Sequence, residues 1–162
     1  MSVGIDDISF YTTNFSLDLQ ELAANNGSDA AKYTVGIGQE RMSVPGADED
    51  VVTMAANACM PLLEGMEERG EDPSAISTIL FATETGIDQS KAAGVYLHSL
   101  LKLSPRCRVV ELKQACYSPL RPCSSQRLGL LVTLKKKCWL LLLISHVTTV
   151  NHQVKLPKVV VR

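Results

Sequence analysis

The chain has 162 residues, of which 46% are hydrophobic, 20% charged and 5% aromatic, and its formal net charge is −1. This length suffices for one domain with a hydrophobic core, and the composition excludes a wholly disordered chain. The near-zero net charge gives no electrostatic reason to expect nucleic acid or an anionic membrane as a partner.

The first fifty residues predict short elements separated by glycine-containing turns. Alternating apolar residues predict a strand over 3–11. Ser16 is placed to cap a short helix over 17–25, which an Asn-Gly pair then ends. Residues 32–44 are interrupted by glycines and favour a strand and turn.

The longest helical pattern begins at residue 51. Apolar residues recur at helical spacing from there to residue 66, and three carboxylates precede the pattern, where the helix dipole favours negative charge. Pro61 is expected to kink this helix or to end its regular part. A charged loop over 64–72 is expected to follow.

The next segment alternates strand and helix. Residues 76–82 form a short apolar, β-branched run that predicts a buried strand, and residues 109–112 predict another. Between them, residues 91–103 predict a helix with a buried face of Ala92, Val95, Tyr96, Ser99 and Leu103. Strands that alternate with helices indicate an α/β fold with at least partly parallel pairing.

Two residues stand directly after the predicted strands, where ligands and catalytic groups of α/β sheets collect. Glu84 follows the first of these strands and Cys116 follows the second. If the strands pair, both side chains open onto one crevice. A thiolate beside a carboxylate suits acyl transfer, because the sulfur can hold the acyl group while the carboxylate moves protons.

Structural roles for the same residues stay open on spacing alone. A single cysteine after a strand is more often a small core residue, and a carboxylate in that place is more often a loop residue or helix cap. Cys59 lies on the apolar face of its helix and is expected to be structural. Cys107 is expected to be an exposed cysteine at the start of a strand, and His98 a surface or half-buried residue.

The remaining cysteine and targeting signals point to the cytoplasm. Five cysteines, an odd number without a C-x-x-C pair, make a disulfide framework or a zinc site improbable, so no metal is expected. The N-terminus lacks the basic and apolar regions of a signal peptide. The apolar run over 139–144 is far shorter than the roughly 20 residues that a membrane-spanning helix needs.

Residues 1–118 resemble the N-terminal part of bacterial-type hydroxymethylglutaryl-CoA synthase, a thiolase-like condensing enzyme. The resemblance runs in the family's order and without large gaps. The matching stretches are GID-ISFY (4–11), DAAKYTVGIGQ-RMSV (29–44), D-DVVTMAANA (48–58), FATETGID-SKAAGVYLHSLL (81–101) and VVELKQACYS (109–118).

This resemblance implies a thiolase-like α/β fold, of which the chain holds the first half, and a chemical role for each candidate residue. Cys116 would be the nucleophile that acetyl-CoA acetylates, and Glu84 the general acid and base that removes a proton from the acetyl methyl group. The carbanion would add to acetoacetyl-CoA. Asp29 and Ala30 fall where the family contacts the CoA-bearing substrate. The CoA esters are substrates, no cofactor or metal is implied, and intact family members form dimers.

The resemblance stops after Ser118, and the charge pattern changes at the same place. Residues 1–117 hold 8 Lys/Arg and 17 Asp/Glu, whereas residues 118–162 hold 8 Lys/Arg and no acid. One alternative reading frame permits PEKKVLVIASDISRY from Leu134 onward and GEATQGGGA from Gln153 onward, and both resemble the family's continuation. We therefore interpret residues 119–162 as an aberrant basic tail read out of frame.

An out-of-frame tail would leave the enzyme incomplete. The rest of the thiolase-like core and a downstream catalytic histidine of the family would be missing, so we expect this chain to be unstable or inactive. Two other functions remain open: a ketoacyl synthase type of condensing enzyme, and a non-catalytic fragment that pairs with intact subunits. Glu84 argues against the first, because those enzymes use His and Asn partners. A basic tail that binds nucleic acid or a membrane is the alternative to a frameshift.

Overall fold

The computed structural model describes residues 6–114 and, for the backbone alone, residues 137–142 and 160–161. The chain forms two compact units. The larger unit holds residues 6–11 and 51–114 together with the two later strands, and the smaller unit holds residues 12–50. Each unit has its own β-sheet.

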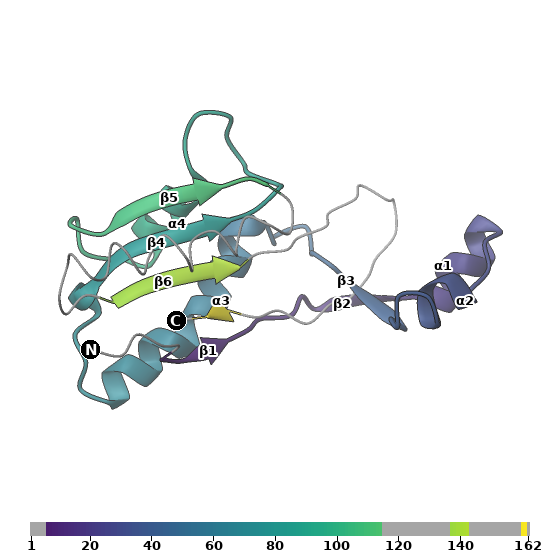
Figure 1. Ribbon diagram of the computed structural model, residues 1–162, viewed down its shortest axis with the longest axis horizontal. Helices are drawn as coiled ribbons and strands as arrows, with labels where there is room; N and C mark the ends of the chain where they lie inside the picture. The colour runs from purple at the N-terminus through teal and green to yellow at the C-terminus, as the bar shows by residue number, and fades with distance from the viewer. Residues whose placement is uncertain (1–5, 115–136, 143–159, 162) are drawn as a thin grey trace. The chain divides into compact units, whose positions relative to one another are not determined.

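The larger unit contains a five-stranded mixed sheet (Figure 1). Its strands are β1 (Ile8–Ser9), β4 (Ile76–Ala82), β5 (Arg108–Leu112), β6 (Lys137–Leu142) and β7 (Val160–Val161). Their order is β1-β7-β6-β4-β5, in which β4 is parallel to both β5 and β6, and β7 is antiparallel to β1 and β6. The parallel pairing expected from the strand and helix order is therefore confirmed.

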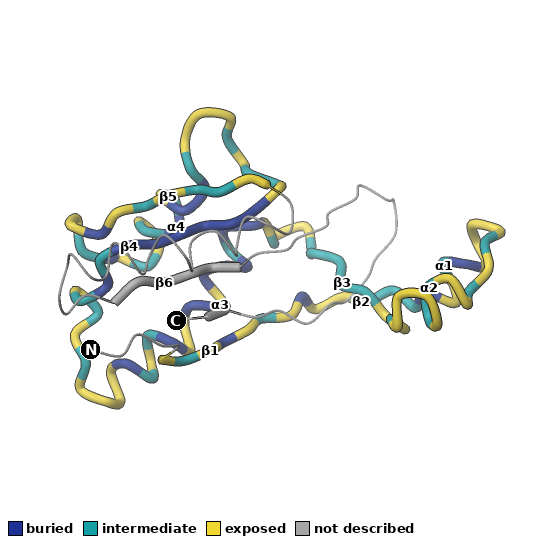
Figure 2. Tube along the Cα trace, in the orientation of Figure 1, coloured by how far each residue is buried: buried dark blue, intermediate teal, exposed yellow. Residues whose placement is uncertain are grey.

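The core of the larger unit lies between β4 and two helices, α3 (Val51–Glu68) and α4 (Ala93–Leu100). A 3-10 turn, η1 (Pro73–Ala75), leads directly into β4. Every residue of β4 except Ser77 is buried, as the dark blue course of this strand in Figure 2 shows. The fully buried side chains of the core are Ala55, Ala58, Cys59, Leu62, Met66, Ile76, Ile79, Phe81, Ala93 and Leu97.

Gly94 lets the start of α4 lie very close to the sheet. A Cβ atom at this position would come 2.7 Å from Cγ1 of Val109 and 3.1 Å from Cβ of Phe81. Ordinary carbon contacts are about 3.5–4.0 Å, so a side chain at this position would force its neighbours to shift. The buried face of α4 is consequently Ala93, Gly94 and Leu97.

Two predictions for the larger unit were wrong, and a third was wrong in part. Pro61 does not end the helix over 51–66, because this proline lies on the exposed side of α3, where the carbonyl freed by its missing N–H can be hydrated; the alternative, a kink at Pro61, stays a prediction. The helix continues to Glu68, so most of the charged segment 64–72 is helical rather than a loop. Cys107 is buried, 8% exposed, because it packs into the core just before β5.

The buried face predicted for α4 was also displaced. Val95 and Ser99 are exposed, and Ala92 and Tyr96 are only half-buried, whereas Leu103 is buried as expected. The helix itself is shorter than the predicted segment 91–103. The displacement follows from Gly94, which contributes nothing to an apolar pattern but allows the closest approach to β5.

The smaller unit consists of a two-stranded sheet and two short helices. Strand β2 (Phe15–Asp18) pairs antiparallel with β3 (Arg41–Val44), and between them lie α1 (Leu19–Asn26) and α2 (Ala31–Thr34). The smaller unit buries Leu19 and Ala23 on one side of α1. Gly27 ends α1 with a φ of 62°, a left-handed conformation that glycine adopts without strain.

Two predictions for the smaller unit were wrong in part. The cap of α1 is Asp18, whose Oδ1 accepts the N–H of Gln20 at 2.9 Å, and not Ser16, because residues 15–18 pair with β3. The segment 32–44 begins with α2 instead of a strand, although its last four residues form β3 as expected. The cap prediction failed because pairing with a distant strand extends β2 up to the first residue of α1.

Candidate active site

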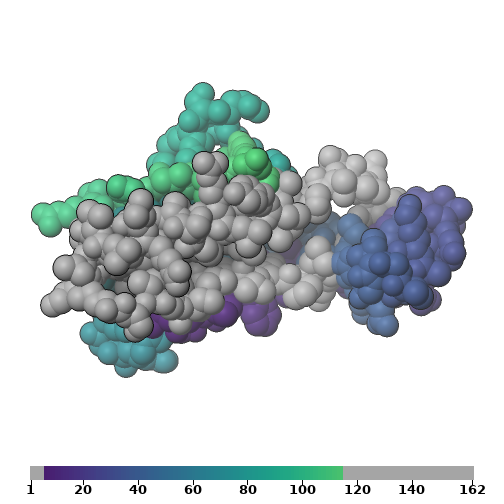
Figure 3. All heavy atoms as spheres, in the orientation of Figure 1, coloured from purple at the N-terminus to yellow at the C-terminus, as the bar shows by residue number. Residues whose placement is uncertain are grey.

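The carboxyl ends of β4 and β5 lie side by side and carry the segments that were predicted to hold the site. Ala82 is paired with Leu112 in the parallel register, and the N–H of Thr83 donates to the carbonyl oxygen of Leu112 at 3.2 Å. Residues 83–92, called the β4–α4 loop below, leave the sheet at this edge (Figure 1). The teal segment at the top of Figure 3 places much of this loop on the molecular surface.

Glu84 sits in a turn that its neighbours hold in place. The hydroxyl oxygen of Thr83, a residue only 3% exposed, accepts the N–H of Thr85 at 3.1 Å and lies 3.3 Å from the Thr85 hydroxyl. Glu84 itself is exposed. The Glu84 carboxylate thus lies exposed directly after a buried strand. The backbone N–H groups of the residues before and after it, Thr83 and Thr85, are both hydrogen-bonded.

The later part of the β4–α4 loop is ordered by Asp88. Its Oδ1 accepts the N–H groups of Ser90 at 2.7 Å and Lys91 at 3.0 Å. These backbone hydrogen bonds lower the pKa of the Asp88 carboxyl below its ordinary value, and the bond from Lys91 has the larger effect. Nζ of Lys91 lies 4.1 Å from the centre of the Tyr96 ring, so its charge is placed over an aromatic face.

A second carboxylate at this edge, Glu111 on β5, was not among the predicted site residues. Its Oε2 accepts the N–H of Ala93, the first residue of α4, and its Oε1 lies 3.1 Å from Nζ of Lys113. The side chain of Glu111 is only 10% exposed. The signal that could have revealed it is a charged residue within the otherwise apolar strand sequence Val-Val-Glu-Leu.

The predicted nucleophile, Cys116, lies outside the described residues. It follows the last residue of β5, Leu112, by four positions in the sequence. Its role therefore stays a prediction, as does its distance from Glu84.

Asp29 and Ala30 lie in the smaller unit, at the start of α2. Oδ1 of Asp29 accepts the N–H of Ala31 at 2.9 Å, and the carbonyl oxygen of Ala30 accepts the N–H of Tyr33 at 3.0 Å. Asp29 is exposed and Ala30 is half-buried. Both residues thus form a capped turn, and their contact with a CoA-bearing substrate stays a prediction.

The other reactive side chains named in the sequence have structural surroundings. Burial raises the pKa of the Cys59 thiol to about 12, so this cysteine stays protonated and unreactive at neutral pH. Burial also raises the pKa of Cys107. His98 is half-buried, and its Nε2 lies 2.9 Å from the carbonyl oxygen of Ser104. The structural role predicted for Cys59 and the half-buried position predicted for His98 are confirmed.

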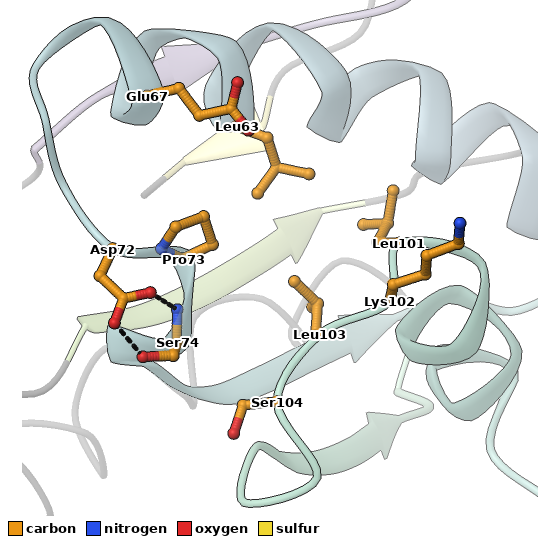
Figure 4. Close-up of a pocket in the computed structure, with 9 residues that line it drawn as sticks. All are labelled: Leu63, Glu67, Asp72, Pro73, Ser74, Leu101, Lys102, Leu103 and Ser104. Atoms are coloured by element: carbon orange, nitrogen blue, oxygen red, sulfur yellow. Dashed lines mark hydrogen bonds between the residues drawn. The ribbon is translucent and has the colours of Figure 1, made fainter.

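A cavity of about 490 Å³ lies near the other end of the strands (Figure 4). It is lined by residues that precede β4, residues that follow α4, and two side chains of α3. The Asp72 carboxylate at its rim accepts both the N–H and the hydroxyl of Ser74, which lowers its pKa, and these are the two dashed lines in Figure 4. This carboxylate serves the 3-10 turn, so we assign the cavity no catalytic role.

The described part of the chain contains neither a metal-binding cluster nor a membrane-spanning helix. No group of three or more His, Cys, Asp or Glu side chains in that part is arranged to hold a metal ion. Over the same residues, no helix has the length and apolar character needed to cross a membrane.

A family model described as the N-terminal part of hydroxymethylglutaryl-coenzyme A synthase matches residues 1–122. The chain belongs to this family. The family match thus covers all of the residues from which the β4–α4 loop, β5 and the segment after β5 are built. The resemblance stated from the sequence motifs is confirmed.

Curated relatives agree with this assignment. The chain is 42% identical over 117 residues to the hydroxymethylglutaryl-CoA synthase of Enterococcus faecalis, an alignment that covers 72% of the chain and 29% of the relative. It is 34% identical over 118 residues to a polyketide-biosynthesis 3-hydroxy-3-methylglutaryl-ACP synthase of Bacillus subtilis, covering 73% of the chain and 27% of the relative. The chain thus spans less than a third of the length of these relatives.

The structural matches extend over a larger share of the chain than the sequence alignments do. The structure of MvaS in complex with 3-hydroxy-3-methylglutaryl coenzyme A matches with a TM-score of 0.71 and 28% identity, covering 98% of this chain and 39% of that one. A hydroxymethylglutaryl-CoA synthase complexed with CoA matches with a TM-score of 0.77 and 28% identity, covering 99% and 42%. The thiolase-like α/β fold, of which this chain holds a part, is confirmed.

Proposed function

We propose that this chain is the N-terminal catalytic part of a hydroxymethylglutaryl-CoA synthase. The reaction joins acetyl-CoA, acetoacetyl-CoA and water to give 3-hydroxy-3-methylglutaryl-CoA and free CoA. The observation that carries the proposal is the position of Glu84, displayed beyond β4 at the edge where β5 leads towards Cys116 in a chain of this family.

In the proposed mechanism the first step forms an acetyl-enzyme. The Cys116 thiolate attacks the carbonyl carbon of acetyl-CoA, the carbon–sulfur bond to CoA breaks, and CoA leaves as a thiol after gaining a proton. The acetyl group is then held as a thioester on the enzyme. This step needs no metal or prosthetic group.

The second step forms the new carbon–carbon bond. Glu84 takes a proton from the acetyl methyl group, and the resulting carbanion adds to the ketone carbon of acetoacetyl-CoA, whose oxygen is then protonated. Water finally cleaves the enzyme thioester, which releases the free carboxylate of the product and regenerates the thiol. Asp29 and Ala30 are proposed to contact the CoA-bearing substrate.

We further propose that residues 119–162 are translated out of frame. The absence of acidic residues after residue 118 and the end of the family match at residue 122 support this. The intact protein is then a longer, cytoplasmic enzyme of the mevalonate pathway that forms a homodimer, and the 162-residue chain is inactive. Sequencing the gene around the codons for Tyr117–Pro119 tests the proposal, which an unrelated or interrupted alternative frame would refute.

Condensation activity tests the proposed function directly. The 162-residue chain and the product of a frame-restored gene are purified and assayed for CoA release from acetyl-CoA and acetoacetyl-CoA. Cys116→Ala should prevent acetyl-enzyme formation, as measured by mass spectrometry of the intact protein. Glu84→Gln should lower the condensation rate by about 100-fold or more, because general acid–base catalysis contributes about that much.

Matched variants control for losses that have nothing to do with the site. Cys107→Ala removes a thiol, and Glu68→Gln removes an exposed carboxylate at the end of α3. Both should keep the activity of the parent. Full activity of Cys116→Ala or of Glu84→Gln would refute the role given to that residue.

One comparison gives a reason to test substrates carried on acyl carrier protein. The relative from Bacillus subtilis is a 3-hydroxy-3-methylglutaryl-ACP synthase, and it is 34% identical to this chain over 118 residues. Acetyl groups carried on acyl carrier protein should therefore be assayed beside acetyl-CoA. Faster acetylation from the carrier protein would assign the chain to that donor.

A further inference from the structure

We propose that Glu111 is a positioning residue that holds the loop bearing Glu84 against the strand leading to Cys116. The inference rests on the proposed function, because it gives Glu111 the role of positioning Glu84 relative to Cys116. Three separate contacts carry it: two between β5 or Lys113 and the β4–α4 loop, and one between β5 and Ala93, the residue that directly follows the loop.

The first two contacts fix the ends of the loop. At its start, the N–H of Thr83 donates to the carbonyl oxygen of Leu112 at 3.2 Å. Directly after its end, the N–H of Ala93, the first residue of α4, donates to Oε2 of Glu111. The loop therefore begins on the backbone of β5 and ends on a side chain of β5, and Glu84 lies between these two attachments.

The third contact lies in the middle of the loop, at Gly86. A Cβ atom at this position would come 2.8 Å from Oε1 of Glu111 and 2.8 Å from Nζ of Lys113. The loop backbone thus passes directly over the carboxylate and its partner cation. The position of Glu111 consequently limits how far the loop can move towards or away from β5.

Both side-chain oxygens of Glu111 have a partner. The side chain is only 10% exposed, and its Oε2 accepts the N–H of Ala93 at the start of α4 while its Oε1 faces Nζ of Lys113. Two further residues after Lys113 lead to position 116. Glu111 is thus a link between the segments that supply the proposed base and the proposed nucleophile.

Hydrogen exchange on the full 162-residue chain tests the attachment without any need for catalysis. Glu111→Ala should speed amide exchange at Ala93 by about 10-fold or more, because a hydrogen bond to a charged group is lost. Glu111→Gln keeps an acceptor oxygen and should speed it less. Arg108→Gln, at the exposed start of the same strand, should leave it unchanged. Unchanged exchange in Glu111→Ala would overturn the proposal.

Kinetics of the frame-restored enzyme test the positioning role. Glu111→Ala should lower kcat by about 100-fold, the cost of misplacing a catalytic group by about 1 Å, and change KM for acetyl-CoA by less than about threefold. Glu111→Gln should recover most of kcat. A normal kcat in Glu111→Ala would overturn the positioning role, even if exchange at Ala93 were faster.

A double-variant cycle tests the contact between Gly86 and Glu111, and the remaining measurements separate the proposed function from the positioning role of Glu111. Gly86→Ala should lower kcat in the parent but less in Glu111→Ala, where the flexible end of the Lys113 side chain is the remaining close neighbour of the added methyl group and can move aside. Equal losses in both backgrounds would overturn the contact at Gly86. A parent enzyme that condenses nothing would refute the proposed function, whereas exchange at Ala93 would still decide whether Glu111 holds the loop.

Discussion

Gly94→Ala should destabilise the chain, although alanine is the better helix former. Replacing a helical glycine by alanine ordinarily favours the helix by about 1 kcal/mol. Here the new Cβ would lie 2.7 Å from Cγ1 of Val109 and 3.1 Å from Cβ of Phe81, and Phe81 is fully buried in the core. Overpacking of this kind costs about 1–3 kcal/mol. The net expectation is a loss of about 1 kcal/mol in the free energy of unfolding.

Urea unfolding followed by circular dichroism measures this loss, and a double variant identifies its cause. Val109→Ala removes the nearest contacting methyl group, so Gly94→Ala should cost less in that background than in the parent. A gain in stability from Gly94→Ala would show that helix propensity outweighs packing at the start of α4. Equal effects in the two backgrounds would show that the contact with Val109 does not carry the cost.

Three further outcomes are expected. Burial raises the pKa of Cys59 from 9.0 to about 12, so as pH rises the thiol loses its proton in the unfolded chain before it does in the folded chain. The free energy of unfolding should therefore fall above about pH 9, as measured by urea titrations from pH 7 to 10. A flat profile that Cys59→Ala leaves unchanged would contradict this. The Asp88 carboxyl has a lowered pKa, so its contribution to the stability of the loop is present at neutral pH and disappears as pH falls through that pKa. Hydrogen exchange at Ser90 and Lys91 should then speed up in acid more than the intrinsic exchange rate predicts. This additional acceleration should be absent in Asp88→Asn. Asp18→Ala should cost about 1 kcal/mol in unfolding by urea, whereas Ser16→Ala should cost much less, and equal costs would refute Asp18 as the cap of α1.

Local sequence patterns gave the best predictions for elements whose bounds depend only on their own residues and immediate neighbours. The bounds of β4 were predicted as observed, because an apolar, β-branched run between a proline and a polar turn has few other solutions. The buried face of α4 was not predicted correctly. The helix approaches β5 most closely at Gly94, which has no side chain and therefore leaves no signal in a hydropathy pattern.

Long-range partners account for what the sequence did not reveal in the site. Glu111 forms its bond to Ala93 across 18 residues, so neither segment alone indicates it. Residue spacing placed Glu84 beyond a strand, as observed, but left open whether it was catalytic. The roles of Cys116, Asp29 and Ala30 came from the family resemblance alone.

The two edges of β4 acquire their partners at different times during synthesis. β5 is complete at Leu112, so β4, α4 and β5 can assemble once that residue has left the ribosome. The other edge pairs with Lys137–Leu142, which is made later. In the interval the nascent chain presents an open edge of β4, to which strands of other chains can pair. Translation speed between residues 112 and 142 therefore sets how long this chain is vulnerable to aggregation.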